Sequence, residues 1–478
     1  MMWQAASIAI TLVSLIVIFR ARSYEQGILP LVPTSFFNIP LIMLGNTASA
    51  GIFPIDIVLL GFMLRFFVLS KSQSILSAYR VNCALLLTIL ACYALLRGGY
   101  VLLFDDYQYY ERFIIYGMYR WLFFLCIFLI FLKITPGDRF NCLLYKLVYV
   151  LIAYFSFAIL HQFGIVDLSG WSAIGSQSAY ETDDSFKDIS RAFLGNNAAT
   201  VGCISVFGAL LGILIYESEK NIARLVILLA LLCLIGGGSR SDFMGTIMAL
   251  ITWLFFFGSV KYILPIIKAS TMLIVFLLFS SSVFDLYGFN RLLETDFIGE
   301  ASSQSEGTFA YRVYWWGVIA EHLLDDVSHL LFGYGPNGFR MLSVNSVTPM
   351  SYGHNVYLHT LGELGLVGLF LFILFLTKVF MLFVLRHQCL KGASRFLVGI
   401  AGFYLLQRLF AGISVDSILA VDNMIAMTIV FFFIVAAALS VLRTGALCRE
   451  RELTKVKSTA LPEVSGLIKG KGVGLFND

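Results

Sequence analysis

The sequence predicts an all-α polytopic membrane protein with about 12 or 13 transmembrane helices. Of its 478 residues, 59% are hydrophobic and only 13% are charged, whereas soluble domains average about 45–50% apolar and about 25% charged residues. The mean hydropathy is +0.87, and the apolar residues gather in runs long enough to cross a bilayer core. Because so few polar residues cannot cover a globule, the composition excludes a soluble enzyme, a disordered chain and a nucleic-acid binder.

Each expected span is a run of roughly 14 to 25 mainly apolar residues. The runs lie at 4–19, 27–46, 53–70, 81–100, 113–132, 142–160, 192–216, 225–238, 242–258, 261–283, 364–385, 396–413 and 423–442. Pro30, Pro33 and Pro40 interrupt the second run, so we expect a re-entrant segment or a broken helix that lines a cavity. The first run has no basic segment before it and no cleavage site, so we expect it to be retained.

Basic residues gather on one side of these spans, in 71–80, 133–139, 217–224, 386–395 and the C-terminal tail. This side is expected to be cytoplasmic. The domains then follow as N-terminal transmembrane helices, an outer loop, central transmembrane helices, a large outer loop, C-terminal transmembrane helices and a cytoplasmic tail. Their ranges are 1–160, 161–191, 192–283, 284–363, 364–442 and 443–478. The outer side retains the long polar sequence, so the function is expected there.

Two further patterns limit the alternatives. The eight cysteines lie in the apolar spans or close to their ends and form no CxxC pair, so neither a disulfide framework nor a zinc site is indicated. No internal repeat is visible, which counts against a transporter built from two related halves.

The first polar motif is RAFLGNNAATVG at 191–202, at the outer start of a span. Arg191 is either a snorkelling residue at the membrane interface or part of a functional site. Asn196 and Asn197 favour the functional interpretation, because they would face hydrocarbon unless they line a cavity.

The second motif is GGGSRSD at 236–242, between two apolar spans. One interpretation is a tight turn with an Arg240–Asp242 ion pair, which contributes little if it is solvated. The other is an anion site: the glycines let backbone N–H groups approach a phosphate, which Arg240 binds in a bidentate manner next to Ser239. A run of three glycines is costly in conformational entropy, which favours the anion site.

The third motif has two parts, GYGPNGFR at 333–340 and GHNVYLHTLGELG at 353–365. The first part contains a turn signal. In the second, His354 and Asn355 come just before an apolar helix. A lone histidine is more often structural, yet its near-neutral pKa suits it to proton abstraction. His359 lies five residues further on, on another helix face, which argues against a paired metal site.

Upstream of this motif, AYRVYWW places Arg312 beside Tyr311, Trp315 and Trp316. These side chains are candidates for stacking on a sugar ring. Aromatic residues at a membrane interface more often serve as anchors, so both interpretations stay open.

Together these motifs resemble the O-antigen ligase and O-antigen polymerase family of bacterial envelopes. The resemblance rests on the spacing of Arg191 and Gly202, on GGGSRSD, and on GYGPNGF followed by GHNVYLHTLGELGLVG. The last is the most specific, since His-Asn followed by a leucine-rich stretch and G-x-x-G is typical of the family. The resemblance by motif covers about 190–370.

The resemblance implies a GT-C-like glycosyltransferase of the bacterial inner membrane, with its active site facing the periplasm and its C-terminus in the cytoplasm. Such enzymes pass a glycan from undecaprenyl pyrophosphate to an acceptor hydroxyl, with neither a metal nor another cofactor. By resemblance, Arg191 and Arg240 hold the pyrophosphate and His354 activates the acceptor; we add Arg312 as a further candidate for donor binding.

Two arginines lie deep in their spans. Arg120 and Arg408 are expected to face a polar interior. They either complete a positive cavity for the lipid-linked pyrophosphate or pair with Asp56, Asp416 or Asp422 for structure.

Three functions remain. The leading one is a polymerase, whose acceptor is another lipid-linked repeat unit and which acts with a chain-length regulator protein. The second is a ligase, whose acceptor is the lipid A core. The third belongs to another class: a flippase for lipid-linked glycans would explain a cationic interior without catalysis.

Overall fold

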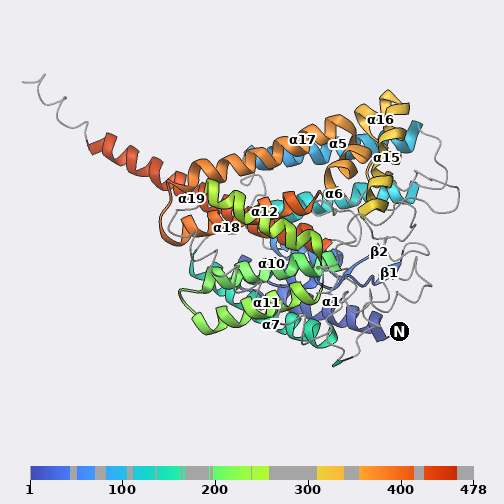
Figure 1. The fold of residues 1–478 in the computed structure, drawn as a ribbon. Coiled ribbons are helices and arrows are strands. Elements are labelled where there is room, and N and C mark those ends of the chain that lie inside the picture. The colour runs from blue at the N-terminus through green and yellow to red at the C-terminus, as the bar shows by residue number, and fades with distance from the viewer. Residues whose placement is uncertain are drawn as a thin grey trace, which may run out of the picture.

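The computed structural model describes residues 2–43, 51–69, 82–104, 111–134, 137–162, 165–166, 193, 198–237, 239–257, 309–338, 355–413 and 425–459. Long helices lying side by side make up most of the fold (Figure 1). Five described helices are long and apolar enough to cross a membrane: α5 (Asn82–Phe104), α6 (Glu111–Phe131), α7 (Asp138–Gln162), α17 (Val356–His387) and α19 (Ile425–Thr459). The prediction of an all-α polytopic membrane protein is confirmed.

Other described helices are shorter, and several of them are as apolar as the long ones. They are α1 (Met2–Arg20), α2 (Tyr24–Ile28), α3 (Leu31–Ser35), α4 (Pro54–Met63), the π-helix η1 (Leu64–Leu69), α10 (Ala198–Ile215), α11 (Lys220–Gly236), α12 (Arg240–Phe256), α15 (Phe309–Asp325), α16 (Val327–Phe332) and α18 (Gly392–Ala411). The expected span at 261–283 lies outside the described residues, so the total of 12 or 13 helices stays a prediction.

The proline-containing run at 27–46 is broken where the structure describes it. Its residues form α2, α3 and the strand β1 (Ile42–Met43). This strand pairs antiparallel with β2 (Gly51–Ile52), placing Ile42 opposite Ile52. Proline removes a backbone donor and clashes with the preceding helical turn, so this run cannot form one continuous helix.

Helix α17 begins directly after Asn355, as expected, and eight residues before the apolar span at 364–385. Helical structure begins at Val356 and is interrupted at Gly365, whose φ is 65°. The polar segment before Gly365 is helical because Asn355 caps it.

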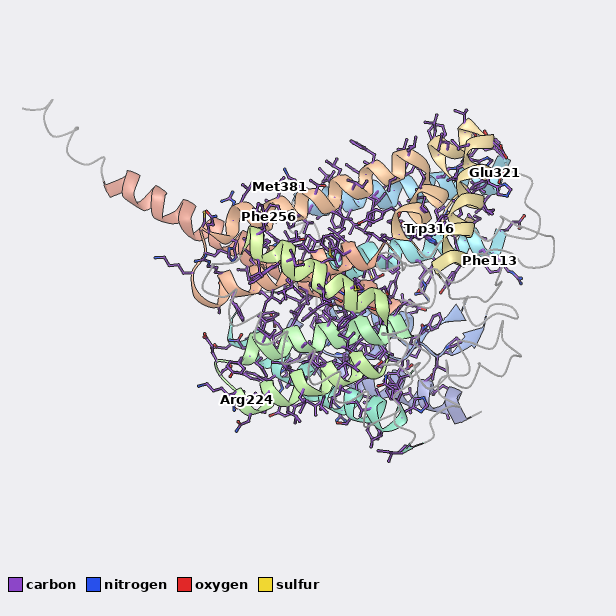
Figure 2. All side chains as sticks on the ribbon, in the orientation of Figure 1. Phe113, Arg224, Phe256, Trp316, Glu321 and Met381 are labelled. Carbon is purple, nitrogen blue, oxygen red and sulfur yellow. The ribbon has the colours of Figure 1, made fainter. Side chains whose placement is uncertain are left out.

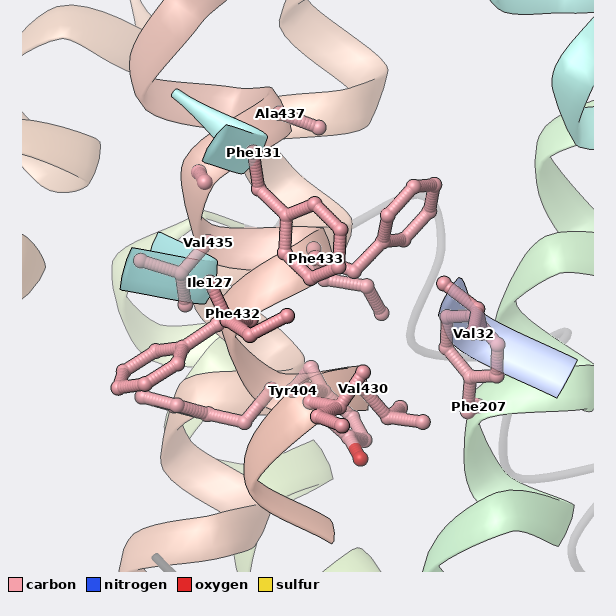
Figure 3. Packing of buried hydrophobic residues seen from close by; sticks show 14 of the residues in the cluster. Val32, Ile127, Phe131, Phe207, Tyr404, Val430, Phe432, Phe433, Val435 and Ala437 are labelled. Atoms are coloured by element: carbon pink, nitrogen blue, oxygen red, sulfur yellow. The ribbon is translucent and has the colours of Figure 1, made fainter. Parts of the chain in front are cut away.

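Many aromatic side chains pack in the core. The apolar part of α19 is buried on every side, and Figure 3 shows Phe432 and Phe433 of this helix among residues of α6, α10 and α18. The ring of Phe433 meets Phe131 at 5.4 Å and Phe207 at 6.1 Å, both edge to face. A helix that is hydrophobic all round is a central one, which explains why the other spans surround α19.

The helices have two distinct ends. We call the end that holds α15, α16 and the start of α17 the motif end, and the opposite end, where α7, α11 and α18 begin, the basic end. In Figure 2, Phe113 and Trp316 mark the motif end and Arg224 marks the basic end. The described parts of all three polar motifs lie at the motif end, so the functional site is sought there.

Candidate functional site

The two parts of the third motif pack against each other. The backbone N–H groups of Tyr334 and Gly335 donate to the carbonyl oxygens of Gly362 and Glu363, each over 2.8 Å. The N–H of Asn337 donates to the Glu363 carboxylate over 2.7 Å. The turn at 333–338 is thereby fixed to the first two turns of α17. The structure brings together two segments that the sequence separates by about twenty residues.

Two glycines make this backbone contact possible. Gly333 and Gly365 have φ values of 75° and 65°, a conformation that side chains rarely tolerate. A Cβ atom on Gly333 would also collide with the backbone of Glu363, and one on Gly365 with the backbone of Leu331. Glycine is therefore required at both positions, because φ is positive and because another backbone segment lies too close for a Cβ atom.

Helices α5 and α6 hold the same turn from the other side. The Arg97 Nε atom donates to the Gly333 carbonyl over 2.8 Å, and the Tyr93 hydroxyl donates to the Leu364 carbonyl over 2.9 Å. The Asn337 side chain donates to the Phe113 carbonyl over 3.3 Å. The first 150 residues of the chain, which match no specific family motif, therefore support the third motif.

Glu363 is a functional candidate that sequence reasoning missed. Its side chain is only 2% exposed, and one carboxylate oxygen lies 3.0 Å from the His359 Nε2 atom and 2.7 Å from the Asn337 N–H. The signal in the sequence was the spacing of His359 and Glu363, since residues four apart share a helix face. The carboxylate orders the turn and the helix start together.

His354, the candidate base, lies outside the described residues, but its neighbour Asn355 is well defined. The Asn355 Oδ1 atom accepts hydrogen bonds from the N–H groups of Tyr357 and Leu358, at 3.0 and 3.1 Å. This is an N-cap, which fixes the backbone at the helix start. The next N–H group, that of Val356, donates to the Gly412 carbonyl over 2.8 Å. The chain directly after His354 is thus fastened to the end of α18.

The GGGSRSD turn separates α11 from α12, as expected. Ser239 precedes the first residue of α12, and its hydroxyl donates to the Asp242 carboxylate over 2.6 Å. A Cβ atom on Gly236 would collide with the end of the Gln162 side chain. The Arg240 backbone begins α12, and its side chain lies outside the described residues.

Asp242 pairs with Arg408 of α18. Both side chains are buried, at 1% and 0% exposure, and the Gln407 amide adds a hydrogen bond to Asp242 over 3.2 Å. The sequence suggested Arg240 as the partner of Asp242, and Asp56, Asp416 or Asp422 as partners of Arg408. Asp416 and Asp422 lie outside the described residues. The pairing was missed because it depends on α12 crossing α18, where Gly245 lies against Ala411.

Gly202, the last residue of the first motif, packs on Asp242 and Ser239. A Cβ atom there would come within 2.7 Å of an Asp242 oxygen and 3.0 Å of the Ser239 Cβ atom. The other candidates of this motif, Arg191, Asn196 and Asn197, lie outside the described residues. The glycine nevertheless places the start of α10 beside the start of α12.

The last turn of α18 joins the second and third motifs. Arg408 binds Asp242, which lies two residues after Arg240. The Gly412 N–H donates to the Arg408 carbonyl, and the Gly412 carbonyl accepts from Val356, which lies two residues after His354. The described backbone next to the candidate donor-binding arginine and that next to the candidate base therefore converge on one helical turn.

Comparison with known families identifies the middle part of the chain. Residues 225–373 match the model of the family described as O-antigen ligase. The chain contains an O-antigen ligase domain. The match includes the GGGSRSD turn and both parts of the third motif, while α18 and the Arg191 motif lie outside it. No curated protein matches the chain.

Within the O-antigen ligase domain, α15 carries Arg312 and Tyr311, whose side chains lie outside the described residues. The helix itself packs on the third motif, because Trp316, Ile319 and Leu323 form a small cluster with Tyr334. The Tyr334 hydroxyl also donates to the His322 carbonyl over 3.2 Å. This arrangement places α15 beside the turn and leaves the roles of Arg312 and Tyr311 as predictions.

Arg120 lies outside the O-antigen ligase domain and forms an ion pair with Asp56. Its guanidinium lies 2.5 Å from one Asp56 oxygen and 3.2 Å from the other, and it donates to the Tyr116 hydroxyl over 2.7 Å. The side chain is completely buried. Of the two alternatives left open, pairing with Asp56 is the one observed, and it fastens α4 to α6.

In the described part of the chain, no group of three or more His, Cys, Asp or Glu side chains could hold a metal ion. Asp325 and Asp326 are adjacent acidic residues, and both are exposed. Asp326 caps α16, because its carboxylate accepts a hydrogen bond from the Ser328 N–H over 2.8 Å. Asp326 therefore has a local structural role.

Proposed function

We propose that this protein is an inverting, metal-independent glycosyltransferase that polymerises undecaprenyl-pyrophosphate-linked oligosaccharide repeat units. One observation carries the proposal: the backbone next to Arg240 and the backbone next to His354 are fastened to the same last turn of α18. A donor pyrophosphate bound near the first and an acceptor hydroxyl bound near the second would meet at this turn.

The donor side of the reaction needs positive charge. Departure of undecaprenyl pyrophosphate builds negative charge on its oxygens, and positioned guanidinium groups stabilise that charge best in a water-poor site. In the proposed mechanism Arg191 and Arg240 supply it, with Arg312 as a further contact. The first N–H groups of α12 add the positive end of the helix dipole at the same place.

The acceptor side needs a base. A sugar hydroxyl has a pKa far above neutral, so His354 would accept its proton as the oxygen attacks the anomeric carbon. The bond from that carbon to the pyrophosphate oxygen breaks in the same displacement, and the electron pair leaves with undecaprenyl pyrophosphate. A single displacement inverts the anomeric configuration. Asn355 would position the base, because its cap fixes the adjoining backbone.

The proposal also assigns an orientation. The motif end faces the periplasm, and the basic end, with the C-terminus, faces the cytoplasm of a bacterial inner membrane. The excess of Lys and Arg in the basic-end segments supports this assignment. A chain-length regulator protein is the proposed partner.

A ligase is the second candidate, favoured by the description of the matching family. It would use the same donor site and the same base, and it would differ only in the acceptor, which would be the lipid A core. The two functions are therefore separated by acceptor and not by chemistry.

The test uses purified full-length protein in detergent with undecaprenyl-pyrophosphate-linked repeat units as the sole substrate. We expect a ladder of lengthened glycans that disappears in His354→Ala and persists in His322→Ala, which removes a histidine of α15 at the same end. Transfer that appears only after lipid A core is added would make the protein a ligase. Full activity of His354→Ala would contradict the proposed mechanism, and no transfer to either acceptor would favour the flippase.

A further inference from the structure

A cavity at the basic end lies far from the candidate site. It has a volume of about 190 Å³ and lies between the segment Arg22–Leu29 and the start of α7. One water molecule needs only ~15 Å³ of such space, so the cavity has room for a polyatomic group. The Tyr24 hydroxyl donates to the Ile130 carbonyl near the end of α6 over 3.0 Å, which fixes the wall of the cavity to the bundle.

The walls of this cavity carry an excess of positive charge. Arg22, Arg139 and Lys146 line it, against a single carboxylate, that of Glu25. Among the residues that the structure describes, none of the three cations has a carboxylate oxygen within 4.0 Å. Glu25 is buried at 6% exposure, whereas all three cations are exposed. The opening is therefore cationic and suited to an anion.

The floor of the cavity is apolar. Leu143 is 3% exposed and Leu29 is partly buried, and both line the cavity. Arg139, Leu143 and Lys146 follow one another at spacings of four and three residues, so they share one face of α7. An apolar floor beneath cationic side chains matches a molecule with an anionic head and a hydrocarbon body. Lysine and arginine at a helix end also bind phosphate groups as charge-assisted hydrogen-bond donors.

We propose that this cavity binds a phosphate group and that the phosphate is the headgroup of an anionic membrane lipid. Its place at the end of membrane-spanning helices puts it at the level of lipid headgroups, where anionic lipids attract basic residues. The site is independent of the proposed glycosyl transfer, because it lies at the opposite end of the bundle. Arg22, Arg139 and Lys146 would surround the phosphate, and the first part of the acyl chains would lie on Leu29 and Leu143.

The first test is native mass spectrometry of the purified full-length protein with phosphatidylglycerol, phosphatidylcholine or inorganic phosphate. We expect retained phosphatidylglycerol adducts, about tenfold weaker in Arg139→Gln/Lys146→Gln. The matched control, Lys220→Gln/Arg224→Gln, removes two charges from α11 at the same end and should bind as the wild type does. Equal binding by all three proteins would overturn the proposal. Binding of inorganic phosphate that displaces the lipid would overturn the lipid assignment.

A second test needs no charge variant. Cys142 lines the cavity and is exposed, and Cys389 is exposed at the same end, outside the cavity. In nanodiscs of phosphatidylglycerol, alkylation of Cys142 by N-ethylmaleimide should be several-fold slower than in nanodiscs of phosphatidylcholine, while Cys389 reacts equally in both. Peptide mass mapping separates the two sites. Equal rates at Cys142 in both lipids would contradict a bound headgroup.

Discussion

Asp242 and Arg408 form a buried ion pair that joins the first turn of α12 to the last turn of α18. The pair lies two residues from Arg240, and its carboxylate also accepts from Ser239. It thus sets the position of the backbone on which the proposed donor site depends. This role differs from that of a cation facing the substrate, which was one of the alternatives for Arg408.

Removing one partner of this pair should destabilise the protein strongly. Asp242→Ala leaves the Arg408 guanidinium buried without a counter-charge, which costs about 3–5 kcal/mol. Asp242→Leu combined with Arg408→Met should recover part of the stability, since well-packed apolar residues often replace a buried pair at little cost. Glycan transfer should stay low in both variants, because Ser239 loses its acceptor. Thermal unfolding in detergent measures the first effect, and an unchanged melting temperature of Asp242→Ala would contradict it.

Gly365→Ala should disrupt the contact between the third-motif turn and α17. The substitution combines a φ of 65° with a collision against the Leu331 backbone, and strained backbone alone costs about 1–3 kcal/mol. Gly99→Ala is the matched control, because a Cβ atom added to this helical glycine of α5 would meet nothing within 4 Å. The control should be as stable as the wild type or more stable by about 0.5–1 kcal/mol. If both variants unfold at the same temperature, the packing argument fails.

Asn355 should influence turnover more than folding. Asn355→Ala removes two hydrogen bonds to the start of α17, at a cost of about 1 kcal/mol. Because the cap fixes the backbone next to His354, the kcat of glycan transfer should fall well beyond what this small loss explains. Asn355→Asp retains the accepting oxygen and should keep most of the activity. Steady-state kinetics of the three proteins provide the comparison; wild-type kcat in Asn355→Ala would argue against a positioning role.

The stability of α16 should decrease at acidic pH. The Ser328 N–H, followed by the nearby His329, lowers the pKa of Asp326 below its usual value of 3.8. A carboxylate with a depressed pKa stabilises the folded state above its unfolded pKa, and this contribution is lost as the pH falls through the lower folded value. Amide exchange in 327–332, corrected for intrinsic rates, should therefore accelerate below about pH 4. In Asp326→Asn, whose cap does not titrate, this acceleration should be absent; seeing it there would exclude Asp326 as its origin.

Hydropathy was sufficient to predict the membrane class and most helices, because a span needs only length and apolar composition. It marked only the apolar part of α17, from residue 364, because the turns before Gly365 are more polar. Their helical state depends on the Asn355 cap and on contacts with α16 and α18, which no local pattern reveals. The break in the second run was predictable, since proline acts locally.

For the site, the motif segments were found from the sequence and their partners were not. Glu363 was overlooked because its function depends on a turn twenty-six residues earlier, at Asn337. The partner of Arg408 was missed because a buried ion pair between distant helices leaves no fixed spacing. Sequence alone identified residues with unusual chemistry, while tertiary packing decided which of them meet.

The most direct test of the account is a cryo-electron microscopy structure of the protein bound to undecaprenyl pyrophosphate. We expect pyrophosphate density at the motif end, between the start of α12 and Asn355. This density should lie beside the last turn of α18, within reach of the Arg240 guanidinium. Pyrophosphate density elsewhere in the bundle, with the starts of α12 and α17 unoccupied, would contradict it.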